Sequence, residues 1–411
     1  MSDKQKLYVG LDVGTTDVRC VVGREMIDQS GIEILCLAKS ATTGMKKGVI
    51  MQAHDIVSAV DLALDEAERL SGIRVGSATV NINGAHIEAI STKGIAAVSS
   101  PDRVIAEVDR IRAEDAAATL QLPPNREVVQ LYTRSYGIDD QASVKNPIGM
   151  SGARIEADAL AVTASSPHIR SIESVLSQAK ISINHLSSSA LAVAEIAMDA
   201  PSRQSSVGII DIGFGTTSIA VMHEGEVEHI AVIPVGGMHI TNDLAIGLKI
   251  DLVSAEDIKT GQLNLGERRT GSKKIAAPGG DIPYDVGEAY DIAASRVEEL
   301  AELIDAELAK VNFSKNLPGG IIVSGGGSKV KGLLTALRTH LDLPVHLPKI
   351  ESVKGVEQFN DPAYQPAIGL MVLDAILPAG SDKHIRGSTL DSVKNKSIGA
   401  IRKLRSSVKR T

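Results

Sequence analysis

Aromatic side chains are almost absent from this chain of 411 residues. Phe, Tyr and Trp together make up 2% of the sequence, and Trp does not occur. This composition disfavours a surface that binds single-stranded nucleic acid by stacking bases on aromatic rings. Apolar residues nevertheless account for 43% of the chain and charged residues for 23%, which is typical of a globular protein with aliphatic cores. The length predicts two to three domains.

Cysteine and long apolar runs are also scarce. The two cysteines, Cys20 and Cys36, have no third sulfur or neighbouring histidine at metal-ligand spacing, so we interpret them as buried reduced thiols. No run of about 18 apolar residues occurs, and the polar segment 1–6 lacks the apolar stretch of a signal peptide. We therefore expect a protein that is made and kept in the cytoplasm.

Acidic side chains are missing from the segment 394–411. This segment holds seven cations, Lys394, Lys396, Arg402, Lys403, Arg405, Lys409 and Arg410. Without these seven charges, the net charge of −7 becomes −14 for residues 1–393. Residues 1–393 are acidic enough to repel nucleic acid, which is a polymer of phosphates. We therefore do not expect nucleic acid as a partner.

The basic segment has the pattern of an amphipathic helix that lies on a membrane. On a helix, Ile398, Ile401, Leu404 and Val408 form one apolar stripe, accompanied by cations that include Arg402, Lys403 and Arg405. This combination is typical of binding to anionic lipid. The alternative is a solvated tail, because the stripe has no aromatic residue. The polar residues 379–393 are expected to form a flexible tether.

Two segments about 200 residues apart repeat one arrangement of strand, glycine turn and strand. The apolar runs 7–14 and 18–23 flank the first turn, and the runs 207–213 and 218–223 flank the second. A unit that occurs twice indicates two related halves. Helical spacing after the first strands, as at 54–70, predicts an α/β fold.

Each half carries an insertion. In the first, at 86–154, we expect a small α+β domain with one helix at 101–120, capped by Ser100 and opened by Pro101. The second, at 237–318, is expected to contain helices at 240–248 and 254–263, an irregular stretch at 266–283 and a helix at 285–311.

The glycine turns belong to two copies of a motif in which Asp-Xaa-Gly precedes a pair of threonines. The copies are Asp12-Val13-Gly14-Thr15-Thr16 and Asp211-Ile212-Gly213-Phe214-Gly215-Thr216-Thr217. A phosphate can approach the main chain only where no Cβ intrudes, and successive amide donors then form an anion-binding concavity. One such turn alone hardly distinguishes a phosphate site from an ordinary hairpin. Two such turns around one cleft predict a phosphate site.

The aspartate that opens each copy is expected at a strand end that faces the cleft. Together, Asp12 and Asp211 could hold a magnesium ion through its water ligands, because Mg²⁺ gives up water reluctantly. The motif pair therefore predicts a phosphate-bearing ligand and a divalent cation.

Two further elements could complete a nucleotide site. A buried strand ends in Gly325-Gly326-Gly327-Ser328, where a base and ribose could lie against bare backbone; the alternative is an ordinary glycine-rich loop. The pair Gly236-Gly237 is followed by Glu256 and Lys259 on a helix, and these two could bond ribose hydroxyls. The alternative for them is an exposed salt bridge between residues three apart. None of the four elements alone is specific for a nucleotide site, but their combination is.

This layout resembles the superfamily of actin, heat-shock chaperones and sugar kinases, and within it the FtsA family of bacterial division proteins. Segments along essentially the whole chain carry the resemblance to FtsA, and the run Asn-Pro-Ile-Gly-Met-Ser-Gly is the most specific of them. The segments are 44–50, 145–152, Gly236-Gly237 with Thr241 and Asp243, and 367–370. The resemblance implies an actin-like (ribonuclease H-like) two-domain α/β fold with an inserted small α+β domain.

The resemblance also implies ATP and Mg²⁺ as ligands and assigns their contacts. The phosphates would be held by Gly14, Thr15, Thr16, Gly213, Gly215, Thr216 and Thr217, the metal by Asp12 and Asp211, the ribose by Glu256 and Lys259, and the adenine by residues 325–327.

Three residues depart from the family pattern. Asp17 stands where relatives often carry Lys, Phe214 where Gly is common and Ser218 where Asp is common. Without a lysine at position 17, a charge-assisted contact with phosphate is weakened. Without an aspartate at position 218, the site lacks a carboxylate that could orient water. ATP binding is therefore expected, and hydrolysis is left open.

The resemblance divides the chain into subdomains. The ranges are 1–85, 155–203 and 361–378 for subdomain 1A, 86–154 for the inserted subdomain 1C, 204–236 and 319–360 for 2A, 237–318 for 2B, 379–393 for the linker, and 394–411 for the membrane-targeting helix.

In FtsA proteins the second insertion receives the C-terminal peptide of FtsZ. Arg296, on the expected helix 285–311, resembles a basic position that faces this groove; the alternative is a surface pair with Glu299. We therefore expect a protein that polymerises on the cytoplasmic face of the inner membrane, anchors FtsZ filaments at the division septum and recruits later division proteins. An ATP-hydrolysing enzyme of the same fold is one alternative, and another actin-like adaptor such as PilM is a second. Ser218 argues against the first and the basic tail against the second.

Overall fold

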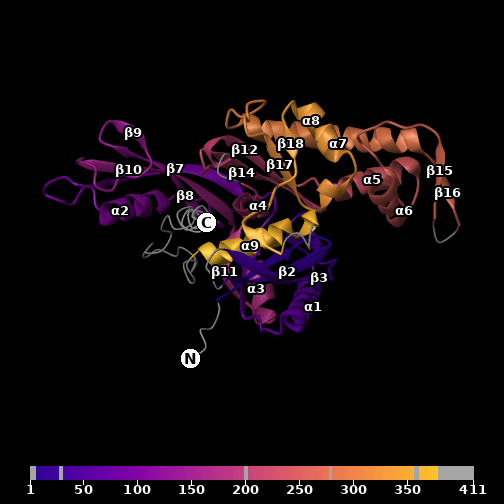
Figure 1. The fold of residues 1–411 in the computed structure, drawn as a ribbon, viewed down its shortest axis with the longest axis horizontal. Helices are drawn as coiled ribbons and strands as arrows, with labels where there is room; N and C mark the ends of the chain where they lie inside the picture. Colours follow the sequence, from indigo (N-terminus) through magenta and orange to yellow (C-terminus); the bar gives the residue numbers. More distant parts are fainter. Residues whose placement is uncertain (1–5, 27–30, 199–201, 277–279, 356–360, 378–411) are drawn as a thin grey trace.

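The computed structural model describes residues 6–26, 31–198, 202–276, 280–355 and 361–377. Its long axis runs from the strands around α2 (Glu107–Ala118) to the hairpin of β15 (Ser272–Ile275) and β16 (Ile282–Asp285), as Figure 1 shows. The expected tether and membrane helix, 379–411, lie outside the described residues.

A six-stranded sheet forms the first half. Its order is β11-β6-β1-β2-β3-β19, in which β1, β2 and β3 are antiparallel and β6 runs parallel to β1. The bounds are β1 (Leu7–Val13), β2 (Asp17–Glu25), β3 (Ile32–Ala41), β6 (Ser77–Asn81), β11 (Ser182–Ser187) and β19 (Val353–Lys354). A short hairpin, β4 (Met45–Lys46) and β5 (Val49–Ile50), follows β3.

Helices cover both faces of this sheet. On one face lie α1 (Ala53–Ser71) and α3 (Ser166–Gln178), and on the other lie α4 (Ser189–Ala197) and α9 (Gln365–Ile376), which also separates this sheet from the second half (Figure 1). Successive residues of β2 alternate between the faces: Cys20 joins the core under α1, and Val21 joins the core under α9. Both cysteines are buried free thiols, as expected.

The second half repeats the strand order of the first and then extends it. Its sheet runs β18-β17-β12-β13-β14-β7-β10-β8-β9, and the first five strands reproduce the order and directions of β11-β6-β1-β2-β3. The five are β12 (Ser206–Ile212), β13 (Thr217–His223), β14 (Glu226–Ile233), β17 (Ile321–Ser324) and β18 (Val345–His346). The prediction of two related halves is therefore confirmed.

The first insertion supplies three of the last four strands of this sheet. The four strands are β7 (Glu88–Ala97), β8 (Arg126–Ile138), β9 (Gln141–Val144) and β10 (Arg154–Ser165). The fourth, β10, begins at the predicted end of the insertion, residue 154, and pairs with β7 and β8, so the sheet continues beyond the predicted boundary. The junction with the second half is narrow, because β14 pairs with β7 at Ala231 and Glu88. The inserted domain thus extends the edge of the sheet of the second half. The chain on either side of the insertion belongs to the first half.

The helix of this insertion starts later than predicted. It begins at Glu107 rather than at Pro101, because the residues before it form backbone contacts with the segment 149–152. Ile105 N donates to Met150 O at 2.9 Å, and Val104 forms a bridge with Ser151. Helical start signals at Ser100 and Pro101 are overridden by this tertiary pairing.

The second insertion is more regular than predicted. Its helices are α5 (Gly237–Leu248), α6 (Leu252–Asp257), the π-helical turn η2 (Ile258–Gln262) and α7 (Val286–Ala309). The stretch 266–283, which was expected to be irregular, contains β15 and the start of β16, so that prediction was wrong there. The hairpin forms because Ile275 and Tyr284 bury their side chains on one face.

The remaining elements complete the second half and the return to the first. They are η1 (Ser202–Gln204), η3 (Gly326–Lys329), α8 (Leu333–Leu341) and η5 (Pro362–Tyr364). Among the helices of the described segments, none has both the length and the apolar character needed to span a bilayer.

A glycine in β1 lets α9 pack directly on the first sheet. A Cβ on Gly10 would lie 2.0 Å from Ala367 O and 2.4 Å from Met371 N. We predict that Gly10→Ala destabilises the protein by about 1–3 kcal/mol, the usual cost of overpacking, and lowers the thermal midpoint measured by circular dichroism. Gly76→Ala is the control, since a Cβ there meets nothing within 4 Å; equal midpoints for the two variants would contradict the packing argument.

Candidate functional site

The two glycine turns of the repeated motif touch each other across the cleft between the halves. The first joins β1 to β2 and is closed by a hydrogen bond that Gly14 N donates (3.0 Å); the second joins β12 to β13 and is closed by one from Gly213 N (2.9 Å). A Cβ on Gly215 would lie 2.9 Å from Thr15 Oγ1. Glycine therefore allows the close approach of the turns, and the two copies of the motif form one site.

Asp12 is a buried carboxylate near the end of β1. Asn81 Nδ2 donates a hydrogen bond of 2.7 Å to Asp12 Oδ1, while Asn81 Oδ1 accepts one of 2.7 Å from Val13 N. Burial raises the pKa of Asp12 to about 7, the charge of Arg19 opposes this shift, and Asp211 adds to it. No local pattern points to Asn81, because its role depends on β6 lying parallel to β1.

Asp211 occupies the equivalent place in β12. It is buried, and its Oδ1 has no hydrogen-bond partner among the residues that the structure describes. Burial raises the pKa of Asp211 to about 6, while a hydrogen bond with Ser189 and the charge of Arg19 act in the opposite direction. Within the described ranges no group of three or more His, Cys, Asp or Glu is placed to hold a metal directly.

Arg19 is the residue of this site that the motif search missed. Its Nη2 lies 2.7 Å from Asp17 Oδ2, and its guanidinium carbon lies 5.7 Å from the centroid of the Tyr364 ring. The charge of Arg19 acts on both buried aspartates. Residues two apart on a strand share a face, so Asp17 and Arg19 could have been recognised as a pair. Arg19 therefore brings a cation to the first glycine turn, although one side of its guanidinium is paired with Asp17.

The glycine run after β17 lies against the second aspartate. Gly325 has a φ of 83°, and a Cβ there would lie 2.4 Å from Asp211 Oδ1, because β17 runs parallel beside β12. Ser328 Oγ donates 2.7 Å to Gly325 O and closes the loop. The sequence suggested bare backbone for a base, but at Gly325 the glycine is needed for contact with the end of β12. Gly326 faces more open space, with Ala363 Cβ at 3.7 Å.

Glu256 and Lys259 form an ion pair, although not the exposed pair considered for them. Lys259 Nζ lies 2.6 Å from Glu256 Oε2, and the lysine is 4% exposed. The ammonium group also donates to Thr241 Oγ1 (2.9 Å) and Gly237 O (3.2 Å), and it lies 5.2 Å from the centroid of the Phe214 ring. Burial lowers the pKa of Lys259. This network fixes α5, α6 and η2 against the second glycine turn.

The N-terminus of α5 is bonded to the second glycine turn. Gly237 N donates 3.0 Å to Gly213 O, and Met238 N donates 2.7 Å to Phe214 O. A Cβ on Gly236 would lie 2.6 Å from Gly213 O, so glycine is required for this contact. An apolar cavity opens beside it. Its lining consists of Ile212, Val235, Gly236, Gly237, Ile240, Arg296, Val297, Leu300, Gly327, Val330 and Leu333.

The hydroxyl groups at the start of β13 have partners within the protein. Thr217 Oγ1 donates 2.8 Å to Val235 O, and Ser218 Oγ donates 3.2 Å to Asn83 Oδ1. The hydroxyl of Thr217 is therefore engaged within the protein, and the expected contact of this residue with a phosphate stays a prediction. Asn83 also accepts from Ser189 N at 3.2 Å, so it links the two halves beside the aspartates.

Arg296 does not offer an unpaired charge. Its Nε lies 2.5 Å from Asp243 Oδ2 on α5, its Nη2 lies 3.1 Å from Asp243 Oδ1, and its Nη1 donates to Glu299. The pair with Glu299 is the alternative that the sequence left open, and Asp243 is an additional partner. Two carboxylates neutralise this guanidinium, which also lines the apolar cavity beside Gly236. The expected membrane residues, Ile398, Ile401, Leu404, Val408, Arg402, Lys403 and Arg405, lie outside the described residues.

The residues around the two turns suit a polyanion with a bound cation. The aspartates are desolvated, and Asp211 has an unsatisfied oxygen, so a cation between them would relieve an electrostatic cost. Arg19 Nε is buried without a partner in the described part of the chain, and it lies beside the first turn. A pyrophosphate group could use the amides of both turns and this guanidinium at once.

Family models match two parts of the chain. A model described as cell division protein FtsA matches residues 208–369, and a model of the SHS2 domain inserted in FtsA matches residues 84–163. The cell division protein FtsA of Pseudomonas aeruginosa is 32% identical over 373 residues, which cover 89% of each chain. FtsA of Bacillus subtilis is 30% identical over 375 residues, 90% of this chain and 83% of the relative.

Solved structures with lower identity share the fold. The PilM–PilN type IV pilus biogenesis complex matches with a TM-score of 0.61 at 16% identity, covering 89% of this chain and 98% of that chain. MreB5 of Spiroplasma citri bound to ADP matches with a TM-score of 0.52 at 14% identity, covering 90% and 96%. The MamK double helical filament matches with a TM-score of 0.50 at 15% identity, covering 90% and 99%. These likenesses show that the fold is the actin-like fold.

The raised pKa of Asp12 predicts a pH-dependent gain of stability when its charge is removed. Between the ordinary aspartate pKa of 3.8 and about 7, the folded state holds a proton that the unfolded state releases, so the contribution of this group to stability falls as pH rises. We predict that Asp12→Asn melts at a higher temperature than the parent at pH 7.5, without nucleotide or Mg²⁺, and that the gain shrinks towards pH 4.5.

The exposed carboxylate of Asp65 on α1 supplies the control for this test. Asp65→Asn makes the same change of net charge at the surface. A gain for Asp12→Asn that does not depend on pH, or one that Asp65→Asn reproduces, would contradict the assignment of a buried carboxylate with a raised pKa.

Proposed function

The chain belongs to the FtsA family of actin-like cell division proteins, and on this premise we propose that it binds ATP with Mg²⁺ in its interdomain cleft, polymerises on the membrane and anchors FtsZ filaments at the division septum. The observation that carries the proposal is the contact between the two glycine turns, where Gly215 meets Thr15. Because both halves contribute to this site, its affinity for a ligand depends on the distance between them. A filament protein whose assembly depends on nucleotide requires such a dependence.

In this proposal the phosphates lie between the two turns. The amides around Gly14 and Gly213 donate to phosphate oxygens, Arg19 supplies the cation, and Asp12 with Asp211 holds the waters of Mg²⁺. Bound Mg²⁺ would neutralise phosphate charge and favour the ionised form of both aspartates. MreB5, which shares the fold, is described with bound ADP, and this description supports a nucleotide as the ligand.

The ribose and adenine are proposed to lie on the side of the second half. Glu256 is the partly exposed member of the buried network with Lys259, so it can accept a hydrogen bond from a ribose hydroxyl. The glycines at 325–327 border the base in this proposal, and Gly326 has the most open space of the three, with Ala363 Cβ 3.7 Å from a Cβ built on it. ATP hydrolysis is not part of the proposal, because Ser218 donates to Asn83 and supplies no carboxylate.

Attachment to the membrane is proposed for residues 394–411. Their seven cations are each worth about 1 kcal/mol near an anionic leaflet, and four aliphatic side chains add apolar burial. One copy would bind weakly, and a filament would bind strongly because its copies act together. The filament described for MamK, which has the same fold, supports self-association as the source of that avidity.

Removal of the guanidinium at position 19 should weaken nucleotide binding. A hydrogen bond to a charged group contributes about 1.5–3 kcal/mol, so we predict that Arg19→Gln lowers the affinity for Mg·ATP by about tenfold or more in isothermal titration calorimetry. Arg24→Gln is the control, because Arg24 lies on the same strand and pairs with Glu33 at the surface. Absence of binding heat with the parent protein would overturn the nucleotide assignment itself.

The basic segment should carry membrane binding. We predict that deletion of 394–411 abolishes co-sedimentation with liposomes that contain phosphatidylglycerol, and that liposomes of phosphatidylcholine alone retain little of the full-length protein, because they lack the anionic charge. Replacing Arg402, Lys403 and Arg405 by Ala should give an intermediate loss. Sedimentation that survives the deletion would place the anchor elsewhere.

A further inference from the structure

Phe214 places an aromatic ring in the second glycine turn of a chain that has few aromatic residues. It is one of three phenylalanines in the sequence, and it lies between Gly213 and Gly215. Its carbonyl oxygen accepts a hydrogen bond of 2.7 Å from Met238 N at the start of α5, so the backbone that carries the ring is held in place. The residue is half-buried. A glycine at this position would leave the space beside the turn unfilled.

The ring covers the ammonium group of Lys259. Its centroid lies 5.2 Å from Lys259 Nζ, a distance at which the face of an aromatic ring attracts a cation. The three hydrogens of the ammonium group have acceptors within the protein, namely Gly237 O (3.2 Å), Thr241 Oγ1 (2.9 Å) and Glu256 Oε2 (2.6 Å). A lysine has no fourth hydrogen to donate. Lys259 is therefore fully engaged and has no donor left for a ribose hydroxyl.

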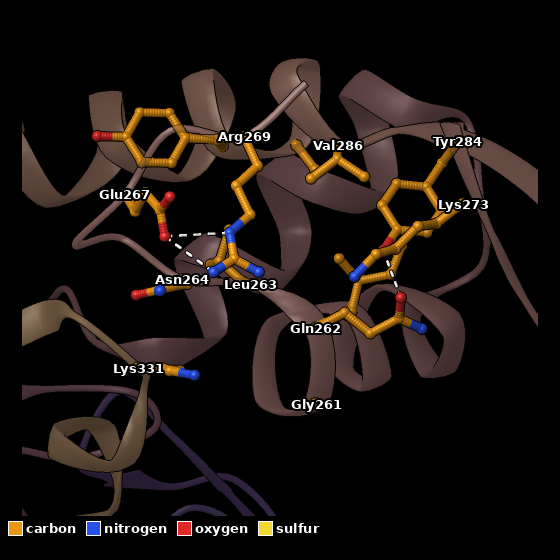
Figure 2. A pocket seen from close by; sticks show the side chains of 13 residues that line it. Gly261, Gln262, Leu263, Asn264, Glu267, Arg269, Lys273, Tyr284, Val286 and Lys331 are labelled. Atoms are coloured by element: carbon orange, nitrogen blue, oxygen red, sulfur yellow. Dashed lines mark hydrogen bonds and ion pairs between the residues drawn. The ribbon is translucent and has the colours of Figure 1, made fainter. Parts of the chain in front are cut away.

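The helical turn that carries Lys259 is also held in place. This turn, η2, is π-helical and ends in a hydrogen bond of 2.8 Å from Leu263 N to Ile258 O. Gln262 Oε1 accepts a hydrogen bond of 2.6 Å from the hydroxyl of the buried Tyr284, as Figure 2 shows. Single π-helical turns occur frequently at functional sites. A ligand could draw the lysine towards itself only by breaking several of these bonds.

Glu256 remains as the acceptor for a sugar. Its Oε2 accepts hydrogen bonds from Lys259 Nζ and from Thr241 Oγ1 (2.5 Å), whereas its Oε1 has no partner among the residues that the structure describes. The side chain is 36% exposed. A carboxylate accepts hydrogen bonds and does not donate them, so a ribose hydroxyl is a suitable partner for Oε1. In this arrangement Lys259 acts as a positioning residue, because it fixes the carboxylate without contacting the sugar.

The ring of Phe214 and the carboxylate of Glu256 contact the same ammonium group. Their distances from it limit the separation between ring and carboxylate to roughly the width of a sugar with its hydroxyl groups. The turn that carries the ring is closely packed, because a Cβ on Gly236 would lie 2.8 Å from Phe214 O and one on Gly215 would lie 3.2 Å from Lys47 N. A substituent on a sugar held at Glu256 would therefore have to displace the ring or the turn.

We propose that Phe214 determines specificity at the ribose side of the cleft, where it admits a nucleoside triphosphate with free ribose hydroxyls and excludes one whose hydroxyls carry a bulky group. The inference rests on the proposed function, in which the cleft binds ATP with Mg²⁺. It assigns a role to a residue at which this chain departs from the family pattern. A glycine at position 214 would not narrow the space beside Glu256 in this way.

The test compares two ligands by isothermal titration calorimetry with the full-length protein and Mg²⁺. The ligands are ATP and ATP that carries a methylanthraniloyl ester on a ribose hydroxyl. We expect the parent to bind ATP more tightly by about tenfold or more, because the ester meets the ring. In Phe214→Ala the two affinities should differ by less than about threefold. The ratio is informative because both ligands share the same base and triphosphate, so a general loss of stability leaves it unchanged.

Two further variants complete the test. Phe214→Leu keeps an apolar side chain without the width of a ring, and its ratio should fall between those of the parent and Phe214→Ala. If Phe214→Ala does not bind ATP, the ratio of Phe214→Leu decides. Phe313→Ala is the control, because this residue also belongs to the second half but its ring packs on His223, with 5.6 Å between the centroids. It should keep the parental ratio.

The outcomes separate this inference from the proposed function. Absence of ATP binding by the parent overturns the nucleotide assignment and the role of Phe214 together. A parent that binds both ligands equally well keeps the nucleotide assignment and overturns the role of Phe214. A parental ratio in both Phe214 variants has the same meaning. Loss of the ratio in Phe313→Ala as well would show a general effect of removing a ring, which also overturns the inference.

Discussion

Contact between two glycine turns from different halves is the constraint on which the rest of this structure depends. Where Gly215 approaches Thr15, a Cβ on the glycine would lie 2.9 Å from Thr15 Oγ1 and 3.2 Å from Lys47 N, so a larger residue would displace its neighbours in the other half. The same approach brings two buried carboxylates near each other, and their raised pKa values record the cost of removing them from water. Asn81, Ser189 and Arg19 offset only part of that cost. The cleft is thus built to gain from a cation and a polyanion together.

The sequence predicted those features that are carried by local patterns. Strand periodicity and the repeated motif located Asp12 and Asp211 near the ends of equivalent strands, and the shared strand order of the two halves confirms the duplication. Local start signals failed at 101–106, where pairing with 149–152 overrides Ser100 and Pro101. They also failed at 272–285, because Lys273 and Lys274 leave the first strand of the hairpin without an apolar run, and the residues Pro278-Gly279-Gly280 favoured an irregular stretch.

Predictions about side chains failed where a partner came from a distant segment. Glu256 and Lys259 have the spacing of a surface ion pair, but Thr241 and Gly237 from α5 enclose the lysine. The sequence pointed to one acidic partner of Arg296, which lies on the same helix. Its second acidic partner, Asp243, lies 53 residues earlier in the chain. Arg19 differs from these cases, because its partner Asp17 is two residues away on the same strand face. A search that considered strand faces as well as motif positions would have found the cation.

The second glycine turn is bonded to the second insertion as well as to its own strands. It accepts hydrogen bonds from the first amides of α5, and Lys259 joins α5 to η2. Shortly after η2, Leu265 N donates a hydrogen bond of 2.8 Å to Lys331 O, which precedes α8. A ligand that moved the turn would therefore act on α5, α6 and η2 together, because these elements share one hydrogen-bond network with it. Any coupling through this network is reciprocal: a change in the position of the second insertion would act on the turn in the same measure.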